Sequence, residues 1–70
     1  MKEMIVYDKN KLEHTLDFER FYKNESGIFF SIYRLYESKS SDLWTEIMVS
    51  EFENLKEVIS FYGYTFERRW

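Results

Sequence analysis

Residues 43–50 show the clearest alternation of apolar and polar positions in the chain. Two sets of side chains face opposite ways along an extended backbone here: Leu43, Thr45, Ile47 and Val49 against Trp44, Glu46, Met48 and Ser50. Such alternation is typical of a strand with one buried face. Residues 28–37 are rich in aromatic and β-branched types, which favour strands, and the polar segment 38–42 has the length of a hairpin loop. The pattern therefore predicts a central β-hairpin, 28–37 paired with 43–50.

After this hairpin the spacing of apolar residues changes from every second residue to the three- or four-residue spacing of a helix. The apolar positions with helical spacing are Phe52, Leu55, Val58, Ile59 and Tyr62. Ser50 and Glu53 have the spacing of a capping box at a helix N-terminus. Gly63 stands where a left-handed residue commonly ends a helix. These signals predict an amphipathic helix near 51–62.

The flanking segments give weaker patterns. We expect short strands near 4–8 and 64–69. Residues 11–23 admit either a strand or a second helix, and we favour the strand because their apolar positions do not gather on one helical face. The predicted fold class is α+β, a small antiparallel β-sheet packed against one amphipathic helix.

Length and composition narrow the protein class. Seventy residues predict a single compact domain, 1–70. The chain has no Cys, no Pro and two Gly, which excludes disulfides, thiolate metal sites and low-complexity structure. No stretch approaches the ~18 apolar residues of a membrane span. No signal-peptide pattern is visible, and we expect a cytoplasmic protein with no membrane partner.

The inventory of catalytic groups is small. His14 is the single histidine, and with no Cys present the chain has no pair for a nucleophilic dyad or a zinc site. We expect His14 to be an ordinary surface or turn residue. Two glycines do not make a phosphate-binding loop. We therefore expect no enzymatic activity, no cofactor and no metal.

The aromatic content of 21% is the unusual feature of the composition, and it changes the functional interpretation. Aromatic side chains fill cores and also dominate protein interfaces. If the helix covers the Ile47 face of the hairpin, Trp44 and Met48 face outward. The candidate apolar anchors are Trp44, Met48, Tyr33 and Tyr36, and the candidate acidic residues that steer a partner are Glu46, Glu51, Glu53 and Glu57. Trp70 is a further candidate anchor.

Three functional hypotheses follow. The favoured one is a small, acidic, non-enzymatic protein-binding module, of the kind that phages or mobile elements use to inhibit a nucleic-acid-handling partner. The first alternative is a homo-oligomeric structural or accessory protein, because an unpaired sheet edge invites pairing with a second copy. The second is a nucleic-acid-binding module that uses sheet aromatics together with Arg20, Arg34, Arg68 and Arg69. A net charge of −3 makes direct nucleic-acid binding the least favoured.

Overall fold

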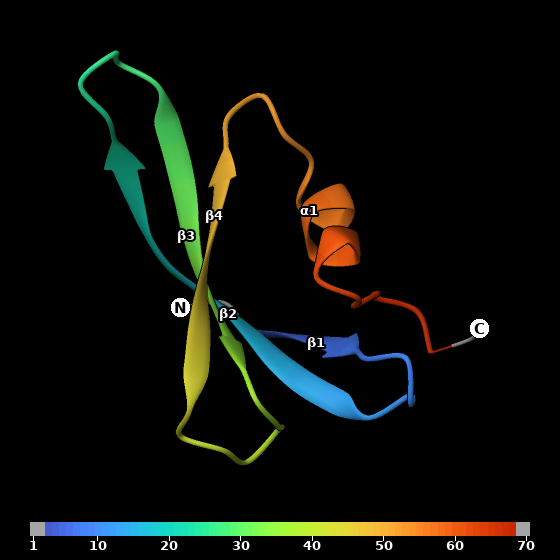
Figure 1. Ribbon diagram of the computed structural model, residues 1–70. Coiled ribbons are helices and arrows are strands. Elements are labelled where there is room, and N and C mark those ends of the chain that lie inside the picture. The colour runs from blue at the N-terminus through green and yellow to red at the C-terminus, as the bar shows by residue number, and fades with distance from the viewer. Residues whose placement is uncertain (1–2, 69–70) are drawn as a thin grey trace.

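The sheet contains four antiparallel strands in the order of the chain (Figure 1). A computed structural model describes residues 3–68. The strands are β1 (Glu3–Tyr7), β2 (Glu13–Lys23), β3 (Phe29–Tyr36) and β4 (Trp44–Ser50), and the helix is α1 (Leu55–Phe61). This is the small α+β fold class predicted from the sequence, and β3 and β4 form the expected hairpin. The predicted central position of that hairpin was wrong, because the strands follow chain order and β4 therefore lies at the edge of the sheet. Residues 13–23 form a strand, as we favoured, and not a second helix.

One face of the sheet packs against α1 and holds the main core. Its buried residues come from all four strands and from the helix: Val6, Leu16, Leu35, Ile47, Val49 and Ile59. Register partners share a face in an antiparallel sheet; Leu16 lies opposite Leu35, and Tyr33 lies opposite Ile47. The helix therefore covers the face that the alternation in 43–50 predicts to be buried. We call the other side of the sheet the open face.

The helix is shorter than the predicted 51–62. Ser50 stays in β4, where it pairs with Phe30, so the helix does not start there. One of the two predicted capping-box contacts forms, and it closes a turn: the Ser50 N–H donates to Glu53 Oε1 at 2.9 Å, but the Glu53 N–H donates to the Ser50 carbonyl at 3.0 Å and not to the Ser50 hydroxyl. Asn54 is the actual N-cap, and its side-chain oxygen accepts from the Lys56 N–H at 2.8 Å.

The C-terminal end of α1 follows the prediction. Gly63 has a φ of 87°, in the left-handed region. The Gly63 N–H donates to the Ser60 carbonyl and the Tyr64 N–H to the Ile59 carbonyl, each at 3.0 Å. These two hydrogen bonds form the Schellman motif, which commonly ends a helix. Within the described residues the helix spans seven, too few to cross a membrane.

The predicted strand 64–69 was wrong over its described part. A single residue, Thr65, pairs with Tyr7 of β1 through two backbone hydrogen bonds of 2.7 and 3.0 Å. The Glu67 N–H then donates to Thr65 Oγ1 at 3.1 Å. This side-chain turn bends the chain away from β1, so that pairing does not continue.

Candidate functional site

The open face presents the outward side chains of β3 and β4. Tyr36 is the cross-strand partner of Trp44, and Ile32 is the partner of Met48. Trp44 and Met48 are each 44% exposed, whereas Ile32 is buried. The structure thus places the predicted anchors Trp44, Met48 and Tyr36 together on a surface that α1 does not cover. An exposed apolar group of this kind is typical of a partner-binding surface.

A charged row crosses this face between the apolar pairs. Asp17 lies opposite Arg34, and Arg34 lies opposite Glu46, so the signs alternate along β2, β3 and β4. The Arg34 guanidinium carbon is 4.5 Å from the centroid of the Trp44 ring. Arg34 Nη2 is also 3.7 Å from Glu19 Oε1, at the β-bulge between Phe18 and Arg20. Arg34 is therefore held from both sides, and it fixes the position of the indole beside it.

Buried polar atoms lie under this row without hydrogen-bond partners. Among the described residues these are Asp17 Oδ1 and Arg34 Nε, whereas Glu19 Oε2, which is also buried, lies 3.1 Å from Arg20 Nε in an ion pair. Asp17 is 6% exposed, although it lies on the open face, because the surrounding side chains cover it. Buried groups of this kind lower stability unless another polar group reaches them.

The outer edge of β4 has free backbone groups. The Glu37 N–H donates to the Leu43 carbonyl, and at the other end the Glu51 N–H donates to the Phe29 carbonyl, both at 2.9 Å. Hydrogen-bonded pairs alternate with non-bonded pairs along an antiparallel ladder, so residues 43, 45, 47, 49 and 51 bond to β3. The N–H and C=O groups of Trp44, Glu46 and Met48 therefore point away from the sheet, and no described residue bonds to them.

The remaining predicted residues lie elsewhere. Tyr33 faces α1, with its ring 5.6 Å from that of Phe18, so it does not share a surface with Trp44. Glu51, Glu53 and Glu57 are exposed, but on the loop after β4 and on α1. The acidic stretch is thus divided between the open face, where Glu46 lies, and the helix side of the sheet. Trp70 and Arg69 lie outside the described residues.

A pocket separates β4 from the helix. It has a volume of about 300 Å³, and its lining is both polar and apolar: Met48, Glu53, Val58, Phe61 and Tyr62. Phe61 is 94% exposed, and Tyr62 is also exposed. Figure 1 shows β4 and α1 running beside one another with the loop 51–54 joining them at one end. The sequence patterns did not reveal this pocket, because Phe61 lies on the helix face opposite its buried stripe.

His14 differs from the sequence expectation, because it is buried and not a surface residue. Its Nε2 lies 2.8 Å from Asp8 Oδ2, and its Nδ1 lies 2.9 Å from the Tyr36 carbonyl oxygen. Both partners are hydrogen-bond acceptors, and each ring nitrogen lies within hydrogen-bond distance of one of them. The hydrogen bond to His14 lowers the pKa of Asp8 below its ordinary value. With both nitrogens engaged, the imidazole ties the β1–β2 turn to β3.

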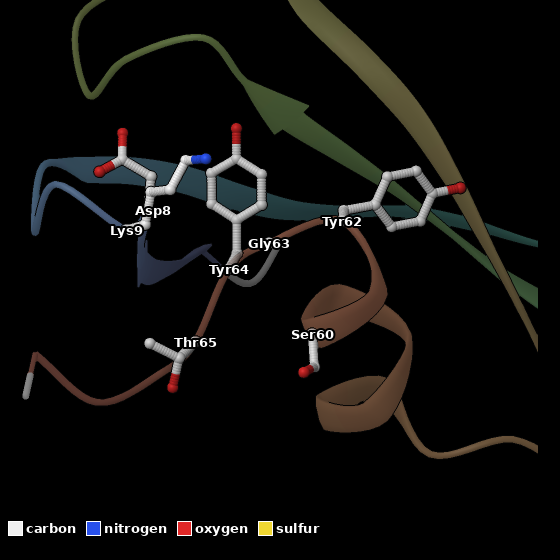
Figure 2. A pocket seen from close by; sticks show the side chains of 7 residues that line it. All are labelled: Asp8, Lys9, Ser60, Tyr62, Gly63, Tyr64 and Thr65. Carbon is white, nitrogen blue, oxygen red and sulfur yellow. The ribbon is translucent and has the colours of Figure 1, made fainter. Parts of the chain in front are cut away.

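A second pocket, of about 460 Å³, lies between the β1–β2 turn and the segment after α1 (Figure 2). Its lining is polar and aromatic: Asp8, Lys9, Ser60, Tyr62, Gly63, Tyr64 and Thr65. Tyr64 packs edge-on against His14, with ring centroids 4.8 Å apart. Burial, together with the charges of Asp8 and Glu37, raises the pKa of Tyr64. The groups in this pocket hold the fold together and do not form a nucleophile–base pair.

The basic residues do not gather into a patch. Arg20 pairs with Glu19 at 3.1 Å, Arg34 is held as described above, and Arg68 lies over the Tyr7 ring at 5.9 Å. Each of these three arginines therefore has a local partner, and Arg20 and Arg34 meet at the acidic Glu19, so the three do not form a row that follows a phosphate backbone. Among residues 3–68 there is also no cluster of three His, Asp or Glu side chains able to hold a metal ion.

Comparison with known proteins adds no relative. No family model matches the chain, and neither a curated protein nor a solved structure resembles it significantly.

Proposed function

We propose that this protein is a non-enzymatic protein-binding module whose contact surface is the open face over β3 and β4. The observation that carries the proposal is the juxtaposition of Trp44 and Met48, both 44% exposed, on a sheet face that the helix leaves uncovered. Large apolar side chains of this type supply most of the energy of protein interfaces. Arg34 holds the indole in place before a partner arrives, which lowers the entropy lost on binding.

The charge of this face supports a protein partner more than a nucleic acid. Glu46 is exposed and makes no ion pair with any residue from 3 to 68. Asp17 and Glu19 add negative potential around Arg34. A face of this charge attracts basic protein surfaces and repels phosphate. The narrower hypothesis of a phage-type inhibitor of a nucleic-acid-handling partner rests on this acidity alone and stays a prediction.

The test is capture of a partner by tagged protein from nuclease-treated lysate, compared between the wild type and Trp44→Ala. We expect the substitution to reduce capture of the same partner at least tenfold, since interface tryptophans often contribute 2 kcal/mol or more, roughly a thirtyfold change. Leu12→Ala is the matched control. Leu12 is also an exposed apolar residue, but it lies in the β1–β2 turn, away from β4.

Two results would contradict the proposal. If Trp44→Ala retains full capture while folding normally, the open face is not the contact surface. If nuclease treatment removes all captured material, the nucleic-acid alternative replaces the protein-binding one.

A further inference from the structure

The free edge of β4 specifies the backbone conformation of whatever binds it. Trp44, Glu46 and Met48 each present one N–H donor and one C=O acceptor outward, at the two-residue spacing of a strand. Only another extended chain offers complementary groups at that spacing, which is the basis of strand addition to a sheet edge. The opposite edge of the sheet differs, because Thr65 already pairs with Tyr7 of β1.

An added strand has a distinct environment on each of its two faces. Residues opposite Thr45, Ile47 and Val49 would point toward the helix side. Ile47 and Val49 are buried apolar residues on that side, and a pocket lined in part by Val58 and Phe61 lies between the edge and α1. This side of the added strand therefore favours apolar residues.

The other side of the added strand continues the open face. Asp17, Arg34 and Glu46 form a row of alternating charge that stops at Glu46, the edge residue. The next position in the row is the residue opposite Glu46 on the incoming strand. Because opposite charges across neighbouring strands are favourable and like charges are not, that position takes Lys or Arg. Its neighbours on this side lie against Trp44 and Met48 and are apolar.

A second copy of the chain fits this edge poorly. The two-fold register that uses all three free residues pairs Trp44 with Met48 of the copy, and it places Glu46 directly opposite Glu46. Two unpaired carboxylates across neighbouring strands repel one another. The charge of the edge therefore favours a different chain.

We propose that the β4 edge binds an extended segment of a partner protein by strand addition, with a basic residue opposite Glu46 and apolar residues on either side. This inference rests on the proposed function and specifies the partner's chemistry.

The probe is a synthetic peptide, acetyl-Thr-Val-Ile-Lys-Ile-Val-Thr-amide. Because its sequence is symmetric, the same side chains lie opposite Trp44, Glu46 and Met48 in either chain direction. Its central Lys lies opposite Glu46 when its two Val residues lie opposite Trp44 and Met48. We expect wild-type protein to bind it at least tenfold more tightly than the same peptide with Glu in the centre. Glu46→Lys should reverse that preference. Glu25→Lys is the matched control, because it makes the same charge change at an exposed turn position far from β4 and should leave the preference unchanged.

Backbone pairing is tested separately by N-methylation of the peptide. In an antiparallel added strand the N–H groups of Lys and Val face β4, so methyl groups on those nitrogens should abolish binding. Methyl groups on the two Ile nitrogens face away from the edge and should preserve it. A parallel strand would give the reverse methylation pattern. In the protein, bound peptide should slow hydrogen exchange at the amides of Trp44, Glu46 and Met48 at least tenfold, whereas those of Thr45 and Ile47 are slow already.

Several outcomes would overturn strand addition: equal binding of the Lys and Glu peptides, equal loss from either methylation pattern, or no binding at all. Protection of the same three amides that grows with protein concentration in the absence of peptide would assign the edge to a second copy. If any of these occurs while partner capture still depends on Trp44, the inference fails and the open-face proposal stands. If the peptide tests fail and partner capture also does not depend on Trp44, both proposals are overturned.

Discussion

The guanidinium of Arg34 lies over the indole of Trp44, 4.5 Å from the ring centroid, and this contact joins β3 to the edge strand β4 on the open face. The residues are diagonal neighbours, since Arg34 is paired with Glu46 and Trp44 with Tyr36. A cation over an aromatic face is worth about 0.5–1 kcal/mol at an exposed site. The contact therefore places a large apolar side chain at the sheet edge and limits the directions in which it can turn.

A double-mutant cycle on this pair should show coupling of about 0.5–1 kcal/mol in the free energy of unfolding. The variants are Arg34→Met, Trp44→Leu and the double mutant, each studied by urea denaturation. Arg34→Lys should keep part of the coupling, because Lys retains the charge but loses the planar stacking. Additive effects of the two single substitutions would show that the contact has no energetic role.

Two neighbouring proline substitutions test the direction of the β4 backbone groups. The Glu46 N–H points outward, so Glu46→Pro removes no ladder bond and should lower the free energy of unfolding by about 1 kcal/mol or less. The Thr45 N–H bonds to β3, so Thr45→Pro leaves a β3 carbonyl without its donor. This substitution should lower the free energy of unfolding by about 1–3 kcal/mol more than Glu46→Pro does. Both side chains are exposed. Denaturation at pH 7 measures both, and equal losses would contradict the assigned ladder.

The lowered pKa of Asp8 leads us to expect that the free energy of unfolding falls in acid. Its pKa is lowered from its ordinary value of 3.8, mainly by the hydrogen bond from His14, so the folded state holds the carboxylate form more strongly than the unfolded chain does. This stabilisation is present above pH 3.8 and is lost as the pH falls through the lower folded value. Asp8→Asn keeps a side-chain acceptor but does not ionise. It should reduce the difference in urea midpoint between pH 6 and pH 2, whereas an unchanged difference would assign it to other carboxylates.

The burial of Ile59 allows a prediction of how much the packing of α1 contributes to the free energy of unfolding. Ile59 is the only fully buried residue of the helix in the described structure, and it closes the core formed by the four strands. Ile59→Ala should lower the free energy of unfolding by about 2–5 kcal/mol. That is a large part of the roughly 3.5–10 kcal/mol expected for a 70-residue domain. Phe61→Ala, at a 94% exposed position two residues away, should change it by about 0.5 kcal/mol or less.

The strands could be predicted because each has a pattern of apolar and polar residues within its own sequence. The alternation at Ile47 and Val49 gave both the strand and its buried face, and it also placed Trp44 and Met48 outward. The helix start was misplaced for a physical reason: the Glu53 side chain accepts from the Ser50 N–H in a turn, as it would in a capping box, while Ser50 remains paired with Phe30. Local spacing does not distinguish those two uses of one side chain.

The candidate site could be predicted only in part, because its geometry depends on cross-strand partners. Tyr33 and Tyr36 look equivalent in the sequence, yet an odd separation along a strand sends them to opposite faces. Burial of His14 depends on Asp8 and on the Tyr36 carbonyl, which the fold brings to its two ring nitrogens. The free backbone groups of β4 carry no side-chain signal, since they follow from which strand lies at the edge.

The order of elements along the chain also has a consequence for synthesis in the cell. Each strand pairs with the next, so the four-stranded sheet can assemble by successive hairpins as it leaves the ribosome. Ile59 and Thr65, which cover its apolar face and its first edge, follow all four strands. The growing protein therefore passes through a stage in which a complete sheet has an uncovered core face and two unpaired edges. Until Ile59 packs, the helix does not cover the apolar side chains of Val6, Leu16 and Leu35.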